Sequence, residues 1–354
     1  MRVEYHTSTW QPDESARLRQ GRAIPGAGAS PELAPFLDLV LADWPTIYPR
    51  EIEKCLRLPY RGELLLIPQV EIVDNTQLRV PLSRISVTVG EKCFETGSMF
   101  RAQAAPAYKE LRRLFSGAHD SLGLRLRDVE GDGDSLVLHT QPVSYFDYLR
   151  SHLCLDWKKE NRKTLRQTIH CGGSLCELQD SPLANCMGLN LLLVSADSQL
   201  VIQYRSEELL FRGGVLAPSV SGGIQLEDAS GKSETAMGDL DLLREAREEL
   251  GITDSSVHDL ALLGITRELI RGGLPEVFLS GHLCQRSEEL VDCWRAAPDR
   301  WETRELRFES VDRSDQDEPP HIRAVHRVVE GIRGTPGVTL LAALALWMRL
   351  RHSC

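Results

Sequence analysis

The stretch from Arg244 to Ile252, Arg-Glu-Ala-Arg-Glu-Glu-Leu-Gly-Ile, gathers carboxylates at a spacing that suits metal chemistry. At 100° per residue of an α-helix, Glu245, Glu248 and Glu249 fall within an arc of roughly 100° on one face. Carboxylates crowded on one face repel each other, and a hard divalent cation such as Mg²⁺ offsets this repulsion because it takes oxygen ligands. Such a cation can also neutralise a diphosphate and activate water for attack on phosphorus. The stretch therefore predicts a metal-binding helix.

The same stretch resembles the Nudix box, whose pattern is G-x5-E-x7-R-E-U-x-E-E-x-G-U, with U an aliphatic residue. The resemblance implies a Nudix α/β/α sandwich that binds Mg²⁺, with Mn²⁺ as the alternative ion, and hydrolyses a diphosphate linkage. It implies Glu245, Glu248 and Glu249 as metal ligands, with Glu248 or Glu249 assisting a water. The matching residues are Arg244, Glu245, Ala246, Glu248, Glu249, Gly251 and Ile252.

The resemblance extends upstream to the segment Ser221-Gly222-Gly223, which is similar to the Gly-Gly turn that precedes the family's helix. It implies that Gly223 contributes its backbone carbonyl to the metal site. It also implies that Arg244 orients a carboxylate.

The first half of the box departs from the family pattern. Counting back from Arg244, the acidic position falls on Ala236 and the glycine position on Ser230. If the last glycine of the Gly-Gly turn is the box glycine, the loop carries extra residues and the acidic position becomes Glu227 or Glu234. In the family this glutamate pairs with the box arginine.

Family members often use a further glutamate outside the box as a ligand or base. Glu276, where a turn enters a strand, is the candidate here, and Glu268 is the second choice. Because loops commonly carry specificity, the residues that read the sugar or base are expected in the N-terminal half and in the loops around 205–220 and 266–275.

The elements around these residues predict an α+β fold. An N-terminal mixed α/β domain is expected over residues 1–156 and a polar connection over 157–185. A Nudix α/β/α sandwich with an extra C-terminal helix is expected over 186–354. Strands are expected at 63–67, 79–82, 85–89, 135–139, 188–194, 199–204, 259–266, 275–282 and 305–309, and helices at 107–115, 145–153, 233–250 and 338–350.

The composition limits the classes of partner. The chain of 354 residues has 41 Lys+Arg and 51 Asp+Glu, a formal net charge of −10, which argues against a nucleic-acid binder. Nine cysteines spread over this length, with no apolar signal stretch, favour a reduced, cytoplasmic, soluble protein. The longest apolar run is too short for a bilayer, so no membrane partner is expected. A homodimer is compatible with the sequence.

The sequence leaves several functions open. The first is a hydrolase that releases a nucleoside monophosphate from a nucleoside diphosphate derivative, either a nucleotide sugar or an ADP-ribose-type compound. The second is a degenerate Nudix domain that senses a nucleotide or serves as an interaction module. A third is isomerisation of a prenyl diphosphate, for which no motif is present. His170, Cys171 and Cys176 lack the second cysteine pair of a zinc site and are better explained as incidental.

Overall fold

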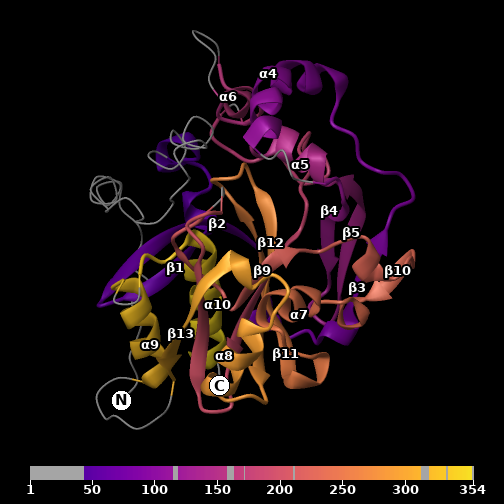
Figure 1. Ribbon diagram of the computed structural model, residues 1–354. Coiled ribbons are helices and arrows are strands. Elements are labelled where there is room, and N and C mark those ends of the chain that lie inside the picture. The colour runs from indigo at the N-terminus through magenta and orange to yellow at the C-terminus, as the bar shows by residue number, and fades with distance from the viewer. Residues whose placement is uncertain are drawn as a thin grey trace.

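The computed structural model describes residues 44–114, 119–157, 163–170, 172–209, 212–311, 319–331 and 334–352. The fold is α+β, with two sheets and helices packed around them (Figure 1). Within these ranges no helix combines the length and the apolar character needed to cross a membrane.

A nine-stranded sheet forms the centre of the molecule, in the order β1-β2-β11-β12-β6-β7-β13, with β8 added to β7 and β9 added to β6. Neighbouring strands in this sheet are antiparallel, except for β12 and β6, which run parallel. The strands are β1 (Cys55–Tyr60), β2 (Glu63–Asp74), β6 (Gly188–Val194), β7 (Gln199–Arg205), β8 (Leu216–Ala217), β9 (Val220–Gly223), β11 (Val257–Glu268), β12 (Leu274–Leu283) and β13 (Thr303–Ser310).

A smaller sheet of four strands has the order β10-β3-β5-β4. Its strands are β3 (Ile85–Val89), β4 (Leu122–Gly131), β5 (Leu136–Ser144) and β10 (Glu234–Ala236). The α-helices are α3 (Asn75–Leu78), α4 (Ser98–Leu114), α5 (Tyr145–Ser151), α6 (Leu165–Ile169), α7 (Arg244–Leu250), α8 (Ser287–Arg295), α9 (Pro320–Val329) and α10 (Val338–His352).

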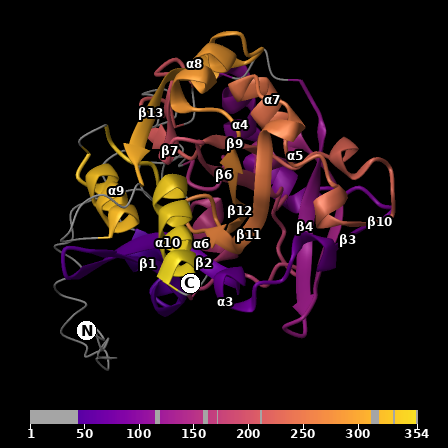
Figure 2. The same ribbon diagram turned by 90° about the horizontal axis from the view of Figure 1, so that it is seen from below.

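The large sheet is buried on both faces, which explains why its central strands are rich in apolar residues. Along β6, Leu191 and Leu193 belong to the core shared with the small sheet, α7 and α8, whereas Leu192 and Val194 belong to the core shared with α9 and α10. This alternation follows from the two-residue period of a strand. Figure 2 shows α9 and α10 on one side of the large sheet and the small sheet on the other.

Most predicted elements are present, with two corrections. The helix predicted over 233–250 is wrong in its first part, where β10 and a 3₁₀ turn at Met237–Asp239 precede the seven residues of α7. The strand predicted at 79–82 is also wrong, because Arg79 adopts a left-handed conformation with φ of +56° and ends α3.

Both sheets take strands from either side of the predicted boundary at residue 156. β2 pairs with β11, with Val73 opposite Ile265, and β10 pairs with β3, with Thr235 opposite Val87. The predicted ranges 1–156 and 186–354 are therefore interleaved in space. Residues 1–43 of the first range lie outside the described residues.

His152, directly after α5, links the helical layer of α4 and α5 to the large sheet. Its Nδ1 lies 2.6 Å from the backbone oxygen of Arg271, and its Nε2 accepts from the backbone N–H of Asn185 at 2.8 Å. Burial, with the nearby Arg271 and other arginines, lowers the pKa of His152 to about 3. A second ring proton would displace the Asn185 N–H, so the ring is neutral in the folded chain.

This histidine should make the fold sensitive to acid. Its stabilising contribution is complete above the ordinary pKa of 6.5 and is lost as the pH falls toward 3, because only the unfolded chain binds the proton. Between about pH 7.5 and about pH 5.5, the native chain should lose about 1.4 kcal/mol of unfolding free energy relative to His152→Gln. Urea denaturation of both proteins at both pH values measures this difference. All other titratable groups are present in both proteins, so their effects cancel in the comparison. An identical pH dependence would contradict it.

Candidate functional site

The helix α7 is short, and its C-terminal end is fixed by its sequence. Ala246 and Leu250 are fully buried in the core, as the sequence predicts for one side of the helix. Gly251 ends the helix with φ of +67°, and its N–H donates to Arg247 O at 3.2 Å. Glycine is suited to this left-handed position because it has no Cβ. In addition, a Cβ on Gly251 would lie 2.4 Å from Cys293 O.

Arg244 gathers the acidic groups of the site around one guanidinium. It donates to Gly223 O, to Glu245 Oε1 and to Glu248 Oε2, each at 2.9 Å. Its Nε donates to Asp228 Oδ1 at 3.0 Å. Four oxygen acceptors therefore converge on a single cationic group at the N-terminal end of α7.

The acidic partner of Arg244 differs from the prediction. Glu227 and Glu234 are both exposed, whereas Asp228 is buried and makes the ion pair. Gly222 precedes Asp228 by the six positions of the box pattern, so the extra residues fall later, between Asp228 and Arg244. These extra residues include β10. The sequence contained the signal for this residue, because Asp228 follows Gly222 at the spacing of the box pattern.

Glu245 packs directly against the Gly-Gly segment of β9. A Cβ built on Gly222 would lie 2.1 Å from Glu245 Cδ, so only glycine leaves room for this carboxylate. The N–H of Gly223 points at Glu245 Oε1 over 3.4 Å. Burial raises the pKa of Glu245, with Glu248 adding to the effect and Arg244 opposing it.

Glu249 is held by β7 and β9. It is 3% exposed and accepts from Gln203 Nε2 at 2.7 Å and from Ser221 N at 3.4 Å. Burial raises the pKa of Glu249 to about 8, against the opposing effect of Arg205. Of the three predicted ligands, Glu245 and Glu248 thus share Arg244, whereas Glu249 is held separately. The three do not place an oxygen each within 4.8 Å of one another.

Glu276 and Glu268 lie in a buried charge network rather than beside the other glutamates. Glu276 accepts from Asn190 Nδ2 at 2.6 Å and pairs with Arg271. Glu268 pairs with Arg271, at 2.9 Å from its Nε, and with Arg212. Burial raises the pKa of Glu276, whereas Arg212 and Arg271 outweigh burial and lower the pKa of Glu268.

Strand pairing nevertheless places Glu276 in line with the Gly-Gly segment. Glu276 on β12 lies opposite Gly188 on β6, which lies opposite Gly223 on β9. Two strand spacings separate the backbones of Glu276 and Gly223 by roughly 10 Å. The register therefore sets Glu276 two strands away from the Gly-Gly segment, whose Gly222 contacts Glu245.

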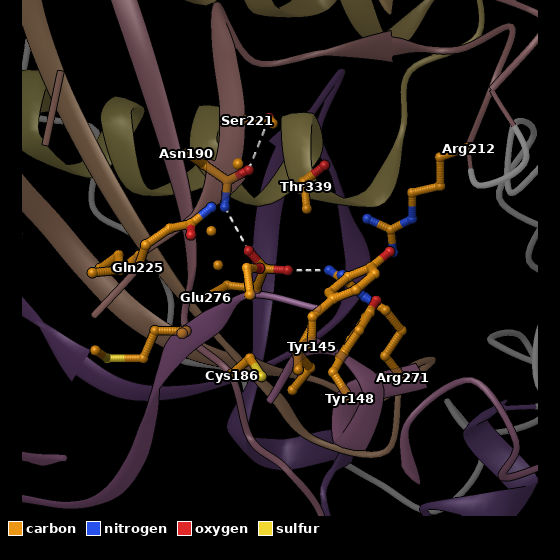
Figure 3. Close-up of a pocket in the computed structure, with 18 of the residues that line it drawn as sticks. Tyr145, Tyr148, Cys186, Asn190, Arg212, Ser221, Gln225, Arg271, Glu276 and Thr339 are labelled. Atoms are coloured by element: carbon orange, nitrogen blue, oxygen red, sulfur yellow. Dashed lines mark hydrogen bonds and ion pairs between the residues drawn. The ribbon is translucent and has the colours of Figure 1, made fainter. Parts of the chain in front are cut away.

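A cavity of about 500 Å³ lies beside Glu276, Gly188 and Gly223. Strands β6, β9 and β12 line one side of it, and Tyr145 and Tyr148 of α5 line another, with their rings 5.7 Å apart and stacked (Figure 3). Arg212 and Arg271 also line it. The sequence indicated the loops around 205–220 and 266–275, from which these arginines come, but it did not single out the tyrosines or the arginines. These residues are far apart along the chain, so no local motif joins them.

Comparison with known proteins gives limited matches. No family model matches the chain, and no curated protein matches it. Among solved structures, the DR0079 protein of Deinococcus radiodurans is 19% identical, with a TM-score of 0.30 over 45% of this chain and 80% of its own. RenU, a Nudix hydrolase from M. smegmatis, is 16% identical, with a TM-score of 0.27 over 48% of this chain and 83% of its own. At this level of likeness, function has to rest on the residues of the site.

Proposed function

We propose that this protein is a metal-dependent hydrolase that cleaves the diphosphate linkage of a nucleoside diphosphate derivative and releases a nucleoside monophosphate. One observation carries the proposal: Gly223 O, Glu245 and Glu248 converge on Arg244, and Gly223 itself lines a cavity that arginines and stacked tyrosines also line. Nucleotide sugars and ADP-ribose-type compounds are the substrate classes that this arrangement favours. A diphosphate suits the arginines, and a flat base or a sugar suits an aromatic wall.

The donor set fits a hard divalent cation. Carboxylate and carbonyl oxygens are the ligands that Mg²⁺ and Mn²⁺ take, and the three oxygens already surround one positive charge. Glu245 and Glu248 are the side-chain ligands proposed here, with Gly223 O as the backbone ligand. When bound, Mg²⁺ would neutralise the diphosphate and activate water.

The remaining residues are proposed to orient the water, the acidic groups and the substrate. Glu248 has the most exposed carboxylate of the three, with 39% of its side chain accessible, so it is the group proposed to orient water. Arg244 keeps the acidic groups together and forms an ion pair with Asp228. When a cation binds, the guanidinium of Arg244 can move toward Asp228. Arg271, paired with Glu276 at the cavity wall, is proposed to contact the phosphate of the leaving part.

The decisive experiment is a substrate panel. The full-length protein is incubated with nucleotide sugars, ADP-ribose, dinucleotides and nucleoside triphosphates, with Mg²⁺, with Mn²⁺ or with EDTA. Release of nucleoside monophosphate is then followed. We expect turnover of at least one diphosphate-linked substrate with the metals and none with EDTA. Failure to turn over any member with either metal would overturn the proposal.

A nucleotide sensor is the second candidate, because Arg244 already neutralises the acidic groups without a metal. The same panel separates the two functions. Calorimetric binding of a nucleotide without turnover under either metal would favour the sensor.

A methyl group on Gly222 should displace Glu245 and reduce catalysis. Gly222→Ala is expected to lower kcat by roughly 10²-fold, because a shift of about 1 Å in a reacting group costs that much. Steady-state kinetics with the best substrate of the panel measure the effect. Gly97→Ala is the control, since a Cβ there meets no atom within 4 Å. Unchanged kinetics in Gly222→Ala would show that Glu245 is not held as described.

A further inference from the structure

Two histidines and an aspartate gather at the end of the β11–β12 ribbon. His258 and His282 are directly opposite in the antiparallel register, and Asp259 follows His258. Their side chains are 51%, 40% and 76% exposed for His258, His282 and Asp259, whereas the Nδ1 atom of His282 is itself buried. In the part of the chain that the structure describes, only these three form a set of ligand-type side chains whose ligand atoms lie within 4.8 Å of one another.

An irregularity in β11 brings the aspartate to the histidines. After the His258–His282 pair, the next pair is Ala261 with Ser280, so β11 carries one extra residue against β12. Asp259 has φ of +53° at this bulge. In a regular strand the side chain of Asp259 would point to the opposite face from His258. The bulge redirects its carboxylate between the two imidazoles.

The spacing of the three groups is that of metal ligands rather than of hydrogen bonds. Asp259 Oδ2 lies 3.9 Å from His258 Nε2 and 3.8 Å from His282 Nδ1, too far for a hydrogen bond. Ligands at about 2.0–2.1 Å from a tetrahedral ion lie roughly 3.3 Å from each other. Side-chain rotations that bring the ligand atoms closer by about half an ångström would close the difference.

A neighbouring thiol can set the tautomer of His258. Cys284 Sγ lies 3.8 Å from His258 Nδ1. With the proton on Nδ1 donated to this sulfur, Nε2 presents its lone pair toward Asp259. Such a partner on the second ring nitrogen is the usual companion of a metal-ligating histidine.

We propose that His258, Asp259 and His282 form a second metal site, which binds a borderline-soft divalent ion of the Zn²⁺ class. Two imidazoles and a carboxylate suit Zn²⁺, whereas an all-oxygen donor set such as that of α7 suits Mg²⁺. His282 follows Glu276 by six residues along β12, which places this site roughly 20 Å from Glu276 at the wall of the first cavity. The two sites are therefore independent in both chemistry and place.

Three protein ligands would leave a tetrahedral ion one position for a solute, and a second cavity lies beside the two histidines. His258, His282 and Cys284 line this cavity of about 920 Å³ together with Trp347 and Arg351 of α10. The guanidinium of Arg351 lies 5.2 Å from the centre of the Trp347 ring. A water or a small anion would complete the coordination there.

The test is Co²⁺ titration of the full-length, tag-free protein with a non-thiol reductant and excess Mg²⁺. The visible absorption of tetrahedral Co²⁺ reports binding, and displacement by Zn²⁺ reports selectivity. We expect one equivalent of Co²⁺ in the native protein and at least tenfold weaker binding in His282→Ala and in Asp259→Asn. We expect binding at least tenfold weaker than native, but not abolished, in Cys284→Ser.

His139→Ala, on β5 of the small sheet, is the control and should bind as the native protein does. Thermal unfolding without metal verifies that each variant is folded, and Asp259→Asn keeps the shape of the side chain. Absence of tetrahedral Co²⁺ absorption in the native protein would overturn the proposal. Full binding in a folded His258→Ala/His282→Ala double variant would also overturn it, because the ion would then lie elsewhere.

Discussion

Glu248→Gln is expected to lower kcat for Mg²⁺-dependent release of nucleoside monophosphate by roughly 10³-fold, because a metal-held diphosphate gains several kcal/mol in the transition state. Glutamine keeps the size of the side chain but removes the charge that Arg244 and the metal share. Since this side chain is 39% exposed, the fold should be retained. Steady-state kinetics and Mn²⁺ binding by calorimetry measure the two effects together.

The surrounding acids provide matched controls. Asp228→Asn should weaken metal binding or activity by about 10–100-fold, since this buried residue holds Arg244. Glu234→Gln should change nothing, because Glu234 is exposed on β10. Native activity in a folded Glu248→Gln variant would contradict its proposed role. A large loss in Glu234→Gln would contradict the assignment of Asp228 as the partner of Arg244.

Arg166→Met should destabilise the fold by about 3–5 kcal/mol, because it leaves a buried carboxylate without its partner. Arg166 and Asp156 have side chains only 2% and 1% exposed. Arg166 donates to both oxygens of Asp156, at 2.7 and 2.6 Å, and to the backbone oxygens of Leu269 and Ile270, at 2.9 and 2.6 Å. It also donates a hydrogen bond to the hydroxyl of Tyr48, so one side chain joins three separate segments of the chain.

Urea denaturation at neutral pH measures this loss. Arg113→Met is the control and should produce no measurable change, because its ion pair with Glu110 is exposed on α4. Arg166→Met combined with Asp156→Leu should recover part of the stability, because no charge is then buried alone. A loss as small as that of the control would show that Arg166 is not needed to hold these segments together.

The strands were predictable where the sequence is apolar. The range 188–194 agrees with β6, a buried and largely aliphatic strand, and the range 85–89 agrees with β3, in which aliphatic residues alternate with Ser86 and Thr88. The pairing of β2 with β11 was not predictable, because pairing between distant strands leaves no local pattern. The helix predicted over 233–250 shows the same limit, since pairing with β3 makes residues 234–236 a strand.

The candidate site was predictable only in part. The carboxylates of α7 follow from helical spacing, and Glu245 and Glu248 do share one cationic partner. Spacing alone does not reveal that Glu249 faces Gln203, because that depends on how β7 and β9 pack against the helix. The cavity wall depends on tertiary structure in the same way, since Tyr148 and Arg271 are more than a hundred positions apart.

The interleaving of the sheets has a practical consequence for attempts to isolate the half of the chain that holds the candidate site. A fragment beginning at residue 186 would lose β1 and β2 and expose the backbone of β11 along its whole paired edge. Bare edges of this kind recruit other chains and lead to aggregation. The strand β10 would likewise lose β3, and with it the anchor of the loop that leads into α7. Dissecting the protein at the apparent midpoint of its sequence would therefore damage the very part it was meant to preserve.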